Sequence, residues 1–331
     1  MHDFFNICLC HPALLIILLV VGVLALVYGA NGLVDGASAL AKKLGMSDLV
    51  IGLTVVAFGT SMPEFVVNMA SIGVDSTDLA ITNVLGSNII NTFVILGLTA
   101  VVYPVISQKR SRDFDIPMSM IAAVAVLIIV LLTIVSGHDF QGVPQAGGVV
   151  LLLFFAYFLY NTFRHAKDHP DEQTPEEYKV KPLGIALLLI VAGIAGLVIG
   201  GELVVRCAVK VAQDMGVSEA VIGLTVVALG TSLPELATSV VAACKHNCDI
   251  ALGNVVGSNI FNVFFVLGTS AVIRPLPSYD GIVEDSLMAF LGSLLVWLFI
   301  KLNHERKIQR WMGGLLLAVY AVYMTVRLVL L

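Results

Sequence analysis

Two glutamates, Glu64 and Glu235, lie inside long apolar segments, and each directly follows a proline. The first ends the sequence I-G-L-T-V-V-A-F-G-T-S-M-P-E over residues 51–64, and the second ends I-G-L-T-V-V-A-L-G-T-S-L-P-E over residues 222–235. Twelve of these fourteen positions are identical. A charged side chain at the centre of a membrane costs about 2.5–3.5 kcal/mol on insertion scales. A costly feature that occurs twice in one membrane protein predicts a transport site.

Oxygen-bearing residues accompany the first glutamate at helical spacing. On a helix, Ala57, Ser61 and Glu64 fall at positions i, i+4 and i+7, with Thr60 beside them. The same stripe recurs at a constant offset of 171 residues as Ala228, Thr231, Ser232 and Glu235.

A second polar stripe follows in the next apolar segment. Asn83, Ser87 and Asn91 are spaced i, i+4 and i+8, and the last two lie in the motif G-S-N-I-I-N. Such side chains can also join helices to one another, and this structural interpretation stays open for Asn83 and its equivalent. The second copy has the motif G-S-N-I-F-N and repeats the stripe as Asn254, Ser258 and Asn262.

Together the stripes gather carboxylate, hydroxyl, amide and backbone oxygens, which are the ligands of a hard cation. Calcium takes about six to eight flexible oxygen ligands, whereas magnesium holds its water tightly. The two carboxylates carry a charge of −2, which one Ca²⁺ or two Na⁺ would balance. Ions that use overlapping oxygens exclude one another, and this competition is the physical basis of exchange. Protonation of the glutamates, or their pairing with a loop residue, is the structural alternative.

Pro63 and Pro234 lie in the middle of their apolar segments. A proline inside a helix has no N–H to donate and clashes with the carbonyl four residues earlier, which here belongs to Gly59 or Gly230. A freed carbonyl in hydrocarbon is costly unless it faces a ligand, water or another protein group. A simple kink is the structural alternative, but the adjacent glutamates favour an ion site.

The composition is that of an integral membrane protein. Hydrophobic residues make up 58% of the 331 residues, charged residues make up 12%, and the mean hydropathy is +0.97. We therefore predict an all-α, polytopic membrane protein, since the strict alternation of a membrane β-barrel is absent from the sequence. Ten stretches have membrane-spanning length: 13–35, 49–72, 79–103, 115–135, 144–163, 183–205, 219–243, 250–273, 284–301 and 311–330.

The repeat divides the chain into two halves. Residues 1–163 are predicted to form a first five-helix repeat with its motif at 51–91, and residues 183–331 a second with its motif at 222–262. The polar segment 164–182 between them is too short for a domain and is expected to be a solvated linker. Because each copy crosses the membrane an odd number of times, the copies are predicted to be inverted, as in alternating-access carriers.

Lysine and arginine counts predict the orientation in the membrane. With the N-terminus outside, the inside loops hold fourteen of these residues and the outside segments hold four. The expected topology is a multi-pass protein of the cell (inner) membrane with both termini outside and the linker 164–182 in the cytoplasm. The N-terminus lacks the basic region and the small-residue cleavage site of a signal peptide, so we expect residues 14–28 to belong to a retained first helix.

At the paired motifs the chain resembles the cation/calcium exchanger superfamily, and specifically prokaryotic sodium/calcium antiporters. The G-T-S-x-P-E and G-S-N-I-x-N pairs are similar to that family's two alpha repeats, and the resemblance covers essentially the whole chain. It implies that Glu64 and Glu235 are the central calcium ligands, joined by the carbonyls of Thr60 and Thr231. Two asparagines, Asn91 and Asn262, would complete the middle of the cluster. Flanking sodium sites would be lined by Ala57, Ser61, Ser87, Ala228, Ser232 and Ser258.

One position departs from the family pattern. Several family members carry an aspartate where this chain has Asn262. The asparagine removes a titratable group, so the sodium stoichiometry and any potassium dependence do not follow from the resemblance. Three Na⁺ on the two glutamates would leave the site at +1 and make transport electrogenic.

The predicted function is secondary active antiport of Ca²⁺ against Na⁺ by alternating access. The nearest alternative is a Ca²⁺/H⁺ antiporter of the same fold, in which the glutamates bind protons. A passive cation channel is a further alternative, which inverted repeats disfavour. An enzyme is not expected, because all seven histidines lie in predicted loops or near the membrane surface. The sequence predicts no cofactor, no nucleic acid and no obligate protein partner, so Ca²⁺, Na⁺ and the lipid bilayer are the expected partners.

Overall fold

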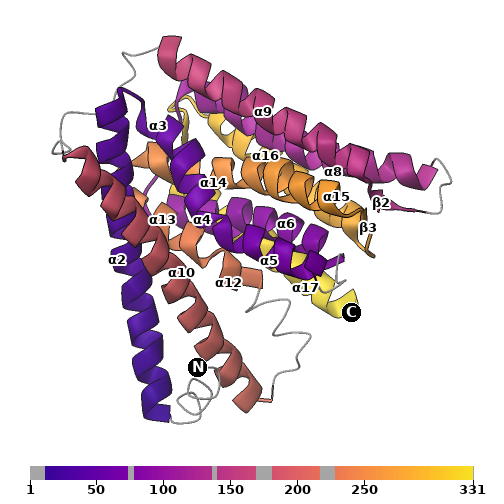
Figure 1. The fold of residues 1–331 in the computed structure, drawn as a ribbon, viewed down its shortest axis with the longest axis horizontal. Helices are drawn as coiled ribbons and strands as arrows, with labels where there is room; N and C mark the ends of the chain where they lie inside the picture. Colours follow the sequence, from indigo (N-terminus) through magenta and orange to yellow (C-terminus); the bar gives the residue numbers. More distant parts are fainter. Residues whose placement is uncertain (1–11, 74–77, 136–139, 169–180, 217–227, 331) are drawn as a thin grey trace.

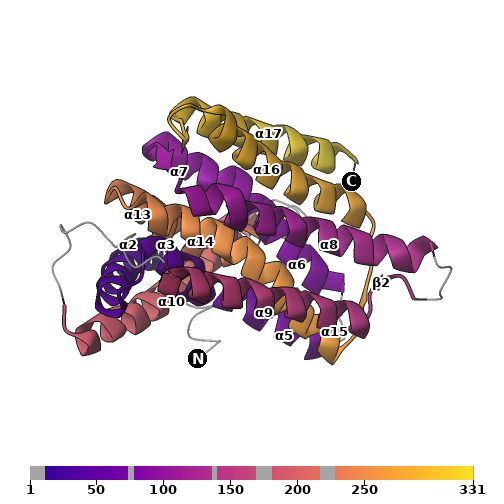
Figure 2. The same ribbon diagram turned by 90° about the horizontal axis from the view of Figure 1, so that it is seen from above.

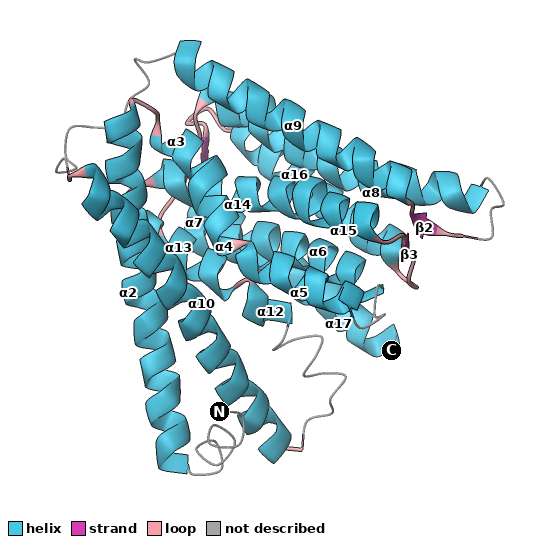
Figure 3. Cartoon of the chain, viewed as in Figure 1, coloured by secondary structure: helices cyan, strands magenta, loops and turns pink. Residues whose placement is uncertain are grey.

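The computed structural model describes residues 12–73, 78–135, 140–168, 181–216 and 228–330. Within these residues the chain is a bundle of helices (Figures 1 and 3). The α-helices are α2 (Pro12–Leu44), α3 (Asp48–Ile51), α4 (Ala57–Thr60), α5 (Met62–Gly73), α6 (Asp78–Ile89), α7 (Leu96–Val102), α8 (Ile116–Val135), α9 (Gln145–Asp168), α10 (Leu183–Asp214), α12 (Ala228–Thr231), α13 (Leu233–Cys244), α14 (Cys248–Ile260), α15 (Gly268–Ile273), α16 (Ile282–Leu302) and α17 (Arg310–Leu330). Four segments are π-helical: η1 (Gly52–Val56), η2 (Ile90–Ile95), η3 (Ser111–Asp115) and η5 (Phe261–Leu267).

Membrane-spanning helices account for most of the predicted spans. Seven described helices are long and apolar enough to cross a membrane, and the bent pair Asp48–Thr60 and Met62–Ile72 raises the number to eight. The seventh predicted span, 219–243, begins outside the described residues. Helix α17 occupies the tenth predicted span but is not among the seven. The polytopic helical fold is therefore confirmed, and the number ten stays a prediction.

The all-α prediction was incomplete, because the connecting segments form short strands. Strand β1 (Val105–Ile106) pairs antiparallel with β4 (Lys307–Ile308), and β2 (Gly142–Val143) pairs antiparallel with β3 (Leu276–Pro277). Backbone N–H and C=O groups outside the helices need partners, and these two ladders supply them. Strands of two residues are too short to carry an alternating sequence pattern.

Two helices extend beyond the apolar stretches that predicted them. Helix α2 continues past residue 35 to Leu44, and α10 continues past residue 205 to Asp214. Both continue through charged residues that the apolar pattern excluded. Each is followed by a glycine with positive φ, Gly45 at 64° and Gly216 at 75°, a conformation that ends helices and favours glycine.

Helices α2 and α10 lie side by side along one flank of the bundle (Figure 1). Glycines let their backbones touch: a Cβ on Gly193 would lie 2.6 Å from the backbone nitrogen of Leu33 and 2.8 Å from the carbonyl oxygen of Gly29. Small residues at such contacts are typical of membrane helix pairs. In this pair they recur every seven residues, at Gly22, Gly29 and Gly36 of α2 and at Gly193 and Gly200 of α10.

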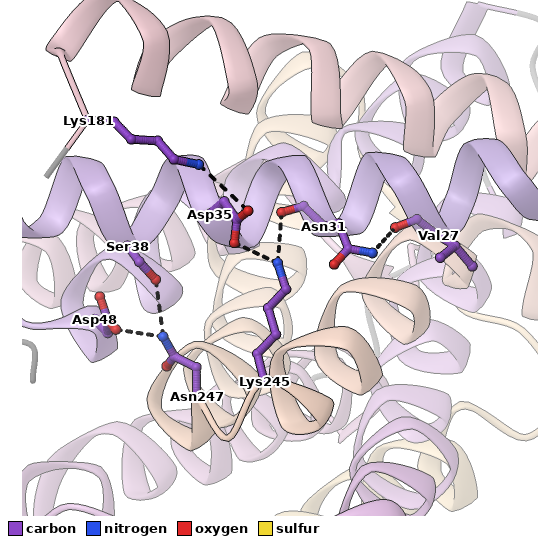
Figure 4. A network of polar contacts seen from close by, with 8 residues as sticks. All are labelled: Val27, Asn31, Asp35, Ser38, Asp48, Lys181, Lys245 and Asn247. Atoms are coloured by element: carbon purple, nitrogen blue, oxygen red, sulfur yellow. Dashed lines mark hydrogen bonds and ion pairs between the residues drawn. The ribbon is translucent and has the colours of Figure 1, made fainter. Parts of the chain in front are cut away.

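A polar network attaches α2 to the turn between α13 and α14 (Figure 4). The carboxylate of Asp35 accepts a hydrogen bond of 2.6 Å from Lys245 Nζ and lies 3.6 Å from Lys181 Nζ. Nearby, the amide of Asn247 donates a hydrogen bond of 2.6 Å to Asp48, at the start of α3. The first helix, the second predicted span and the second repeat are therefore joined at this end of the bundle.

Helix α14, continued by η5 and α15, runs through the middle of the bundle (Figures 1 and 2). In the apolar stretch of Cys248–Ile273, 94% of the residues are buried, compared with 22% in the corresponding stretch of α2. The polar residues of α14 therefore lie inside the protein rather than toward lipid.

Candidate cation site

Both glutamate motifs lie at a break in a helix. Ser61 (φ −84°, ψ 7°) separates α4 from α5, and the helical axis bends there by 42°. Ser232 (φ −89°, ψ 5°) separates α12 from α13 in the same way. The break therefore lies at the serine, and Pro63 and Pro234 become the second residues of new helices, where a missing N–H is tolerated.

The break places each glutamate in the first turn of a helix, at Glu64 of α5 and Glu235 of α13. Both side chains are fully buried. The N-terminal end of a helix carries a partial positive charge that stabilises an anion by about 0.3–1 kcal/mol, and by more in buried geometry. This offsets only part of the cost of burying a carboxylate.

Each glutamate accepts a hydrogen bond from the serine of the other copy. Ser61 Oγ donates to Glu235 Oε1 at 2.9 Å, and Ser232 Oγ donates to Glu64 Oε1 at 3.3 Å. These two hydrogen bonds are reciprocal, so the two copies of the motif meet at one place. Sequence spacing alone did not predict which serine contacts which glutamate.

The serines of the second stripe join the same carboxylates. Ser87 Oγ on α6 donates to Glu64 Oε1 at 3.3 Å, and Ser258 Oγ on α14 donates to Glu235 Oε1 at 3.5 Å. Both serines are buried. Each glutamate thus has one hydroxyl partner from its own copy and one from the other.

Asn83 and Asn254 have the structural role that the sequence left open. Their side-chain amides donate to the backbone carbonyls of Glu64 and Glu235, at 3.3 Å in both cases. Asn254 Oδ1 also accepts a hydrogen bond of 3.0 Å from Thr60 Oγ1. These asparagines therefore join α6 and α14 to the backbone of Glu64 and Glu235.

Several buried oxygens of the two motifs have no hydrogen-bonding partner among the described residues. They are Glu64 Oε2, Glu235 Oε2, Asn91 Oδ1, Asn262 Oδ1 and Thr231 Oγ1. Buried polar atoms are rarely left unpaired, because the loss of solvation is costly. A bound cation would satisfy these oxygens.

Asn91 and Asn262 both lie in π-helical segments, η2 and η5. Short π-helical segments inside α-helices are frequent at functional sites. Both side chains are fully buried, and Asn262 Nδ2 donates to Asn88 Oδ1 at 3.2 Å. The π-turns are not predictable from the apolar pattern.

Two further asparagines, Asn88 and Asn259, were not singled out from the sequence. Asn88 Nδ2 donates to the carbonyl of Asn259 at 3.0 Å, and Asn259 Nδ2 donates to Thr92 Oγ1 at 2.8 Å. Both belong to the G-S-N-I-x-N motifs, so their identity in the two copies was the available signal. These bonds join α6 and η2 to α14.

The remaining predicted residues lie on the same broken helices. Ala57 is fully buried, and its carbonyl accepts hydrogen bonds from Ser61 N at 3.0 Å and Thr60 Oγ1 at 3.3 Å. Ala228 begins α12, so its backbone is placed equivalently on the second broken helix. The described residues contain no cluster of three or more His, Cys, Asp or Glu side chains, so this site has two carboxylates among them.

A buried set of carboxylates, hydroxyls and amides inside a bundle of membrane-spanning helices defines a polytopic membrane transport protein. The family model described as sodium/calcium exchanger protein matches residues 14–164 and 185–329. The chain belongs to this family, which places it among transporters rather than enzymes.

Individual relatives agree with this assignment. The chain is 34% identical over 259 residues to a putative antiporter CaxA from Alkalimonas amylolytica, covering 74% of this chain and 77% of the relative. A shorter match of 116 residues, 40% identical, covers 35% of this chain and 33% of the sodium/calcium exchanger MaX1 from Methanosarcina acetivorans. The solved structure of the sodium-calcium exchanger NCX_Mj, soaked with 2.5 mM Na⁺ and 10 mM Sr²⁺, superposes with a TM-score of 0.79 at 32% identity, over 95% of this chain and 98% of that one.

Proposed function

We propose that this protein is an antiporter that moves Ca²⁺ across the membrane in exchange for Na⁺, with Glu64 and Glu235 as the central ligands. The observation that carries the proposal is that both carboxylates are fully buried, accept hydroxyl bonds from both copies of the motif, and keep one unpaired oxygen each. Family membership and the likeness to NCX_Mj support a calcium exchanger.

The proposed ligand set combines the oxygens around the glutamates with those that the family resemblance implies. Asn91 and Asn262 supply amide oxygens without other partners, and the Thr60 and Thr231 carbonyls complete the calcium site. The flanking sodium sites use the oxygens of Ala57, Ser61, Ser87, Ala228, Ser232 and Ser258. Oxygen donors of mixed charge in a flexible arrangement suit Ca²⁺ better than Mg²⁺.

Competition for the same oxygens couples the two fluxes. Two carboxylates at −2 are neutralised by one Ca²⁺ or two Na⁺, so the site exchanges one kind of ion for the other instead of holding both. A third Na⁺ would give the loaded site a charge of +1 and make each cycle electrogenic. Exchange then requires that the occupied site face each side of the membrane in turn.

Inverted repeats provide the alternation. In the proposal, residues 1–163 and 183–331 are related by an axis in the membrane plane, and the reciprocal bonds of Ser61 and Ser232 support this relation. Helices α2 and α10 move along the central helices as a pair. The protein lies in the cell (inner) membrane with both termini outside and segment 164–182 in the cytoplasm, as the lysine and arginine distribution favours.

Transport into liposomes tests the proposal. Purified protein is reconstituted, and uptake of radioactive Ca²⁺ is followed under an outward gradient of Na⁺, H⁺ or K⁺. We expect uptake that depends on the Na⁺ gradient and is lost in Glu64→Gln and Glu235→Gln. Glu305→Gln is the matched control, because this glutamate lies in an exposed turn outside the helices.

The three gradients separate the candidate functions. Uptake driven by the pH gradient without Na⁺ would identify a Ca²⁺/H⁺ antiporter, and Ca²⁺ leak without any counter-gradient would identify a channel. Wild-type transport in either glutamine variant would refute the site itself.

A further inference from the structure

A polar cavity lies at one end of α8 and α9, apart from the ion site. Its volume is about 600 Å³, and its lining holds three cationic side chains and two aspartates beside three other residues: Lys109, Arg110, Arg164, Asp113, Asp168, Phe114, Asn161 and His165. The linker 164–182, predicted to be cytoplasmic, begins at this end. Basic cavities between membrane helices on the cytoplasmic side are suited to anionic lipid headgroups.

The segments that form the cavity carry a net positive charge. Residues 109–115 and 161–168 contain five lysines and arginines and three aspartates. Lys109 is exposed and has no hydrogen-bonding or ion-pair partner among the described residues, so it is available to an anion. Each aspartate already has an arginine partner: Asp113 with Arg112 at 2.6 Å, Asp115 with Arg110 at 3.3 Å, and Asp168 with Arg164 at 3.6 Å.

The inner wall of the cavity is fixed by Arg110. This side chain is 9% exposed, donates a hydrogen bond of 3.0 Å to Thr162 Oγ1, and stacks over the ring of Phe114 with 5.2 Å to the centroid. It joins the segment before α8 to α9. The positive charge of the Arg110 guanidinium is therefore fixed in position at this wall.

An apolar groove runs along the same helices, further from the linker. Its volume is about 480 Å³, and every side chain that lines it is apolar except for the indole N–H of Trp297. That N–H donates to the carbonyl of Arg112 at 3.0 Å. The α8 side of the groove includes Pro117, Ile121, Val124 and Ile128, and the α9 side includes Val150 and Phe154.

The groove begins directly after the segment that lines the cavity. On α8, groove residues 117, 121, 124 and 128 follow one another at intervals of three or four, which is one face of an α-helix, and cavity residues 110 and 114 lie in and beside the π-helical turn η3 that precedes it. The twelve residues from Pro117 to Ile128 rise about 16 Å at 1.5 Å per residue step. One leaflet of the hydrocarbon core is about 15 Å thick, so the groove matches the depth of an acyl chain.

We infer that this face binds an anionic phospholipid, with its phosphate against Lys109 and Arg164 and one acyl chain in the groove between α8, α9 and α16. A free phosphate would use only the cavity, and a neutral lipid would use only the groove. The lipid fits both parts, which is why the structure favours it. Its binding ties the peripheral helices α8 and α9 to the bilayer and does not depend on which ions are transported.

Native mass spectrometry of the full chain in detergent tests this inference. Wild-type protein is titrated with phosphatidylglycerol, with phosphatidylcholine and with inorganic phosphate. We expect phosphatidylglycerol to bind at least about tenfold more tightly than phosphatidylcholine. A Lys or Arg near a membrane surface contributes about a fivefold factor in affinity, so Lys109→Gln with Arg164→Gln lowers phosphatidylglycerol affinity about 25-fold. Lys43→Gln, an exposed lysine at the end of α2, is the matched control and leaves the affinity unchanged.

A second variant tests the groove. Val124→Phe fills it and is expected to weaken phosphatidylglycerol binding, while a melting temperature close to wild type shows that the variant folds. Equal affinity for the two lipids, or unchanged binding by the double variant, would overturn the inference. So would displacement of phosphatidylglycerol by inorganic phosphate at matched concentration, because the cavity would then be a simple anion site.

Discussion

Ser61 of the first motif donates a 2.9 Å hydrogen bond to Glu235 of the second, across 174 residues of sequence. The reciprocal bond, from Ser232 to Glu64, is longer at 3.3 Å. The two halves of the chain therefore share each carboxylate, and any movement of one half changes the surroundings of the other half's glutamate.

The Ser61 bond can be tested by Ser61→Ala. A hydrogen bond to a charged group contributes about 1.5–3 kcal/mol, so we expect Ca²⁺ uptake below saturation to fall about tenfold or more. Ser232→Ala removes the longer bond and should have the smaller effect. Transport of radioactive Ca²⁺ at several Na⁺ concentrations measures both variants, and equal effects would contradict the asymmetry of the two distances.

The proposed ligand Asn262 brings an uncharged amide to the site, and this role can be tested by Asn262→Asp. The aspartate loses the hydrogen bond that Asn262 Nδ2 donates to Asn88 Oδ1 and adds a third buried carboxylate. We expect a lower melting temperature in the absence of cations, a larger rise when Ca²⁺ or Na⁺ is added, and a changed ratio of Na⁺ to Ca²⁺ transported.

Asn91→Asp is the comparison for that variant, because neither side-chain atom of Asn91 has a hydrogen-bonding partner among the described residues. It adds the same charge without breaking a bond, so its stability without cations should fall less. A transport ratio that stays the same in both variants would show that these amides lie outside the ion site.

The contact between α2 and α10 can be tested by Gly193→Ala. The added Cβ would lie 2.6 Å from a backbone atom of Leu33, so the helices must separate. Overpacking of this kind costs about 1–3 kcal/mol. We expect a lower melting temperature and slower transport.

Gly184→Ala on the same helix is its matched control. A Cβ there meets nothing within 4 Å of the described atoms, and replacing a helical glycine by alanine is favourable by about 1 kcal/mol. Thermal unfolding in detergent should therefore move in opposite directions for the two variants. A decrease in melting temperature of the same size in both variants would mean that the contact between α2 and α10 is not tightly packed.

A cluster around Asp285 is expected to stabilise the other end of the bundle. Its carboxylate accepts hydrogen bonds of 2.6 Å from both Tyr279 and Tyr323 and lies 3.3 Å from Arg327. Arg327 is partly exposed, but Asp285 is buried, and leaving the partly buried hydroxyls of its tyrosine partners without an acceptor costs about 1–3 kcal/mol for each hydroxyl. Asp285→Ala should lower the melting temperature strongly, whereas Glu284→Ala, at the exposed neighbouring position, should leave it nearly unchanged.

The sequence predicted the spans, and which serines gather around the two glutamates, better than it predicted the geometry of either. Apolar length located α8, α9 and α16 closely, because a membrane-facing helix must be apolar along most of its length. The same rule ended α2 at residue 35 instead of Leu44, because helices continue through charged residues once they leave the hydrocarbon. Pro63 predicted a break, but the break lies at Ser61, where the preceding helix ends.

The contacts within the site depend on how distant segments cross. Helical spacing put Ser61 and Glu64 on one stripe, yet the partner of Ser61 is Glu235. That pairing follows from the packing of α4 against α13 and α14, which spacing within one copy does not contain. The π-turns at Asn91 and Asn262 likewise arise from packing in the centre of the bundle.

The seven-residue glycine spacing of α2 and α10 has a consequence for leakage. These helices come from opposite halves of the chain, and their backbones are in contact along the seam. If the pair moves as one body, as proposed, the displacement that opens a path to one side of the membrane also closes the path to the other side. In the proposed exchange cycle, the glycine contact between α2 and α10 thus prevents a continuous pore from forming between the two sides of the membrane.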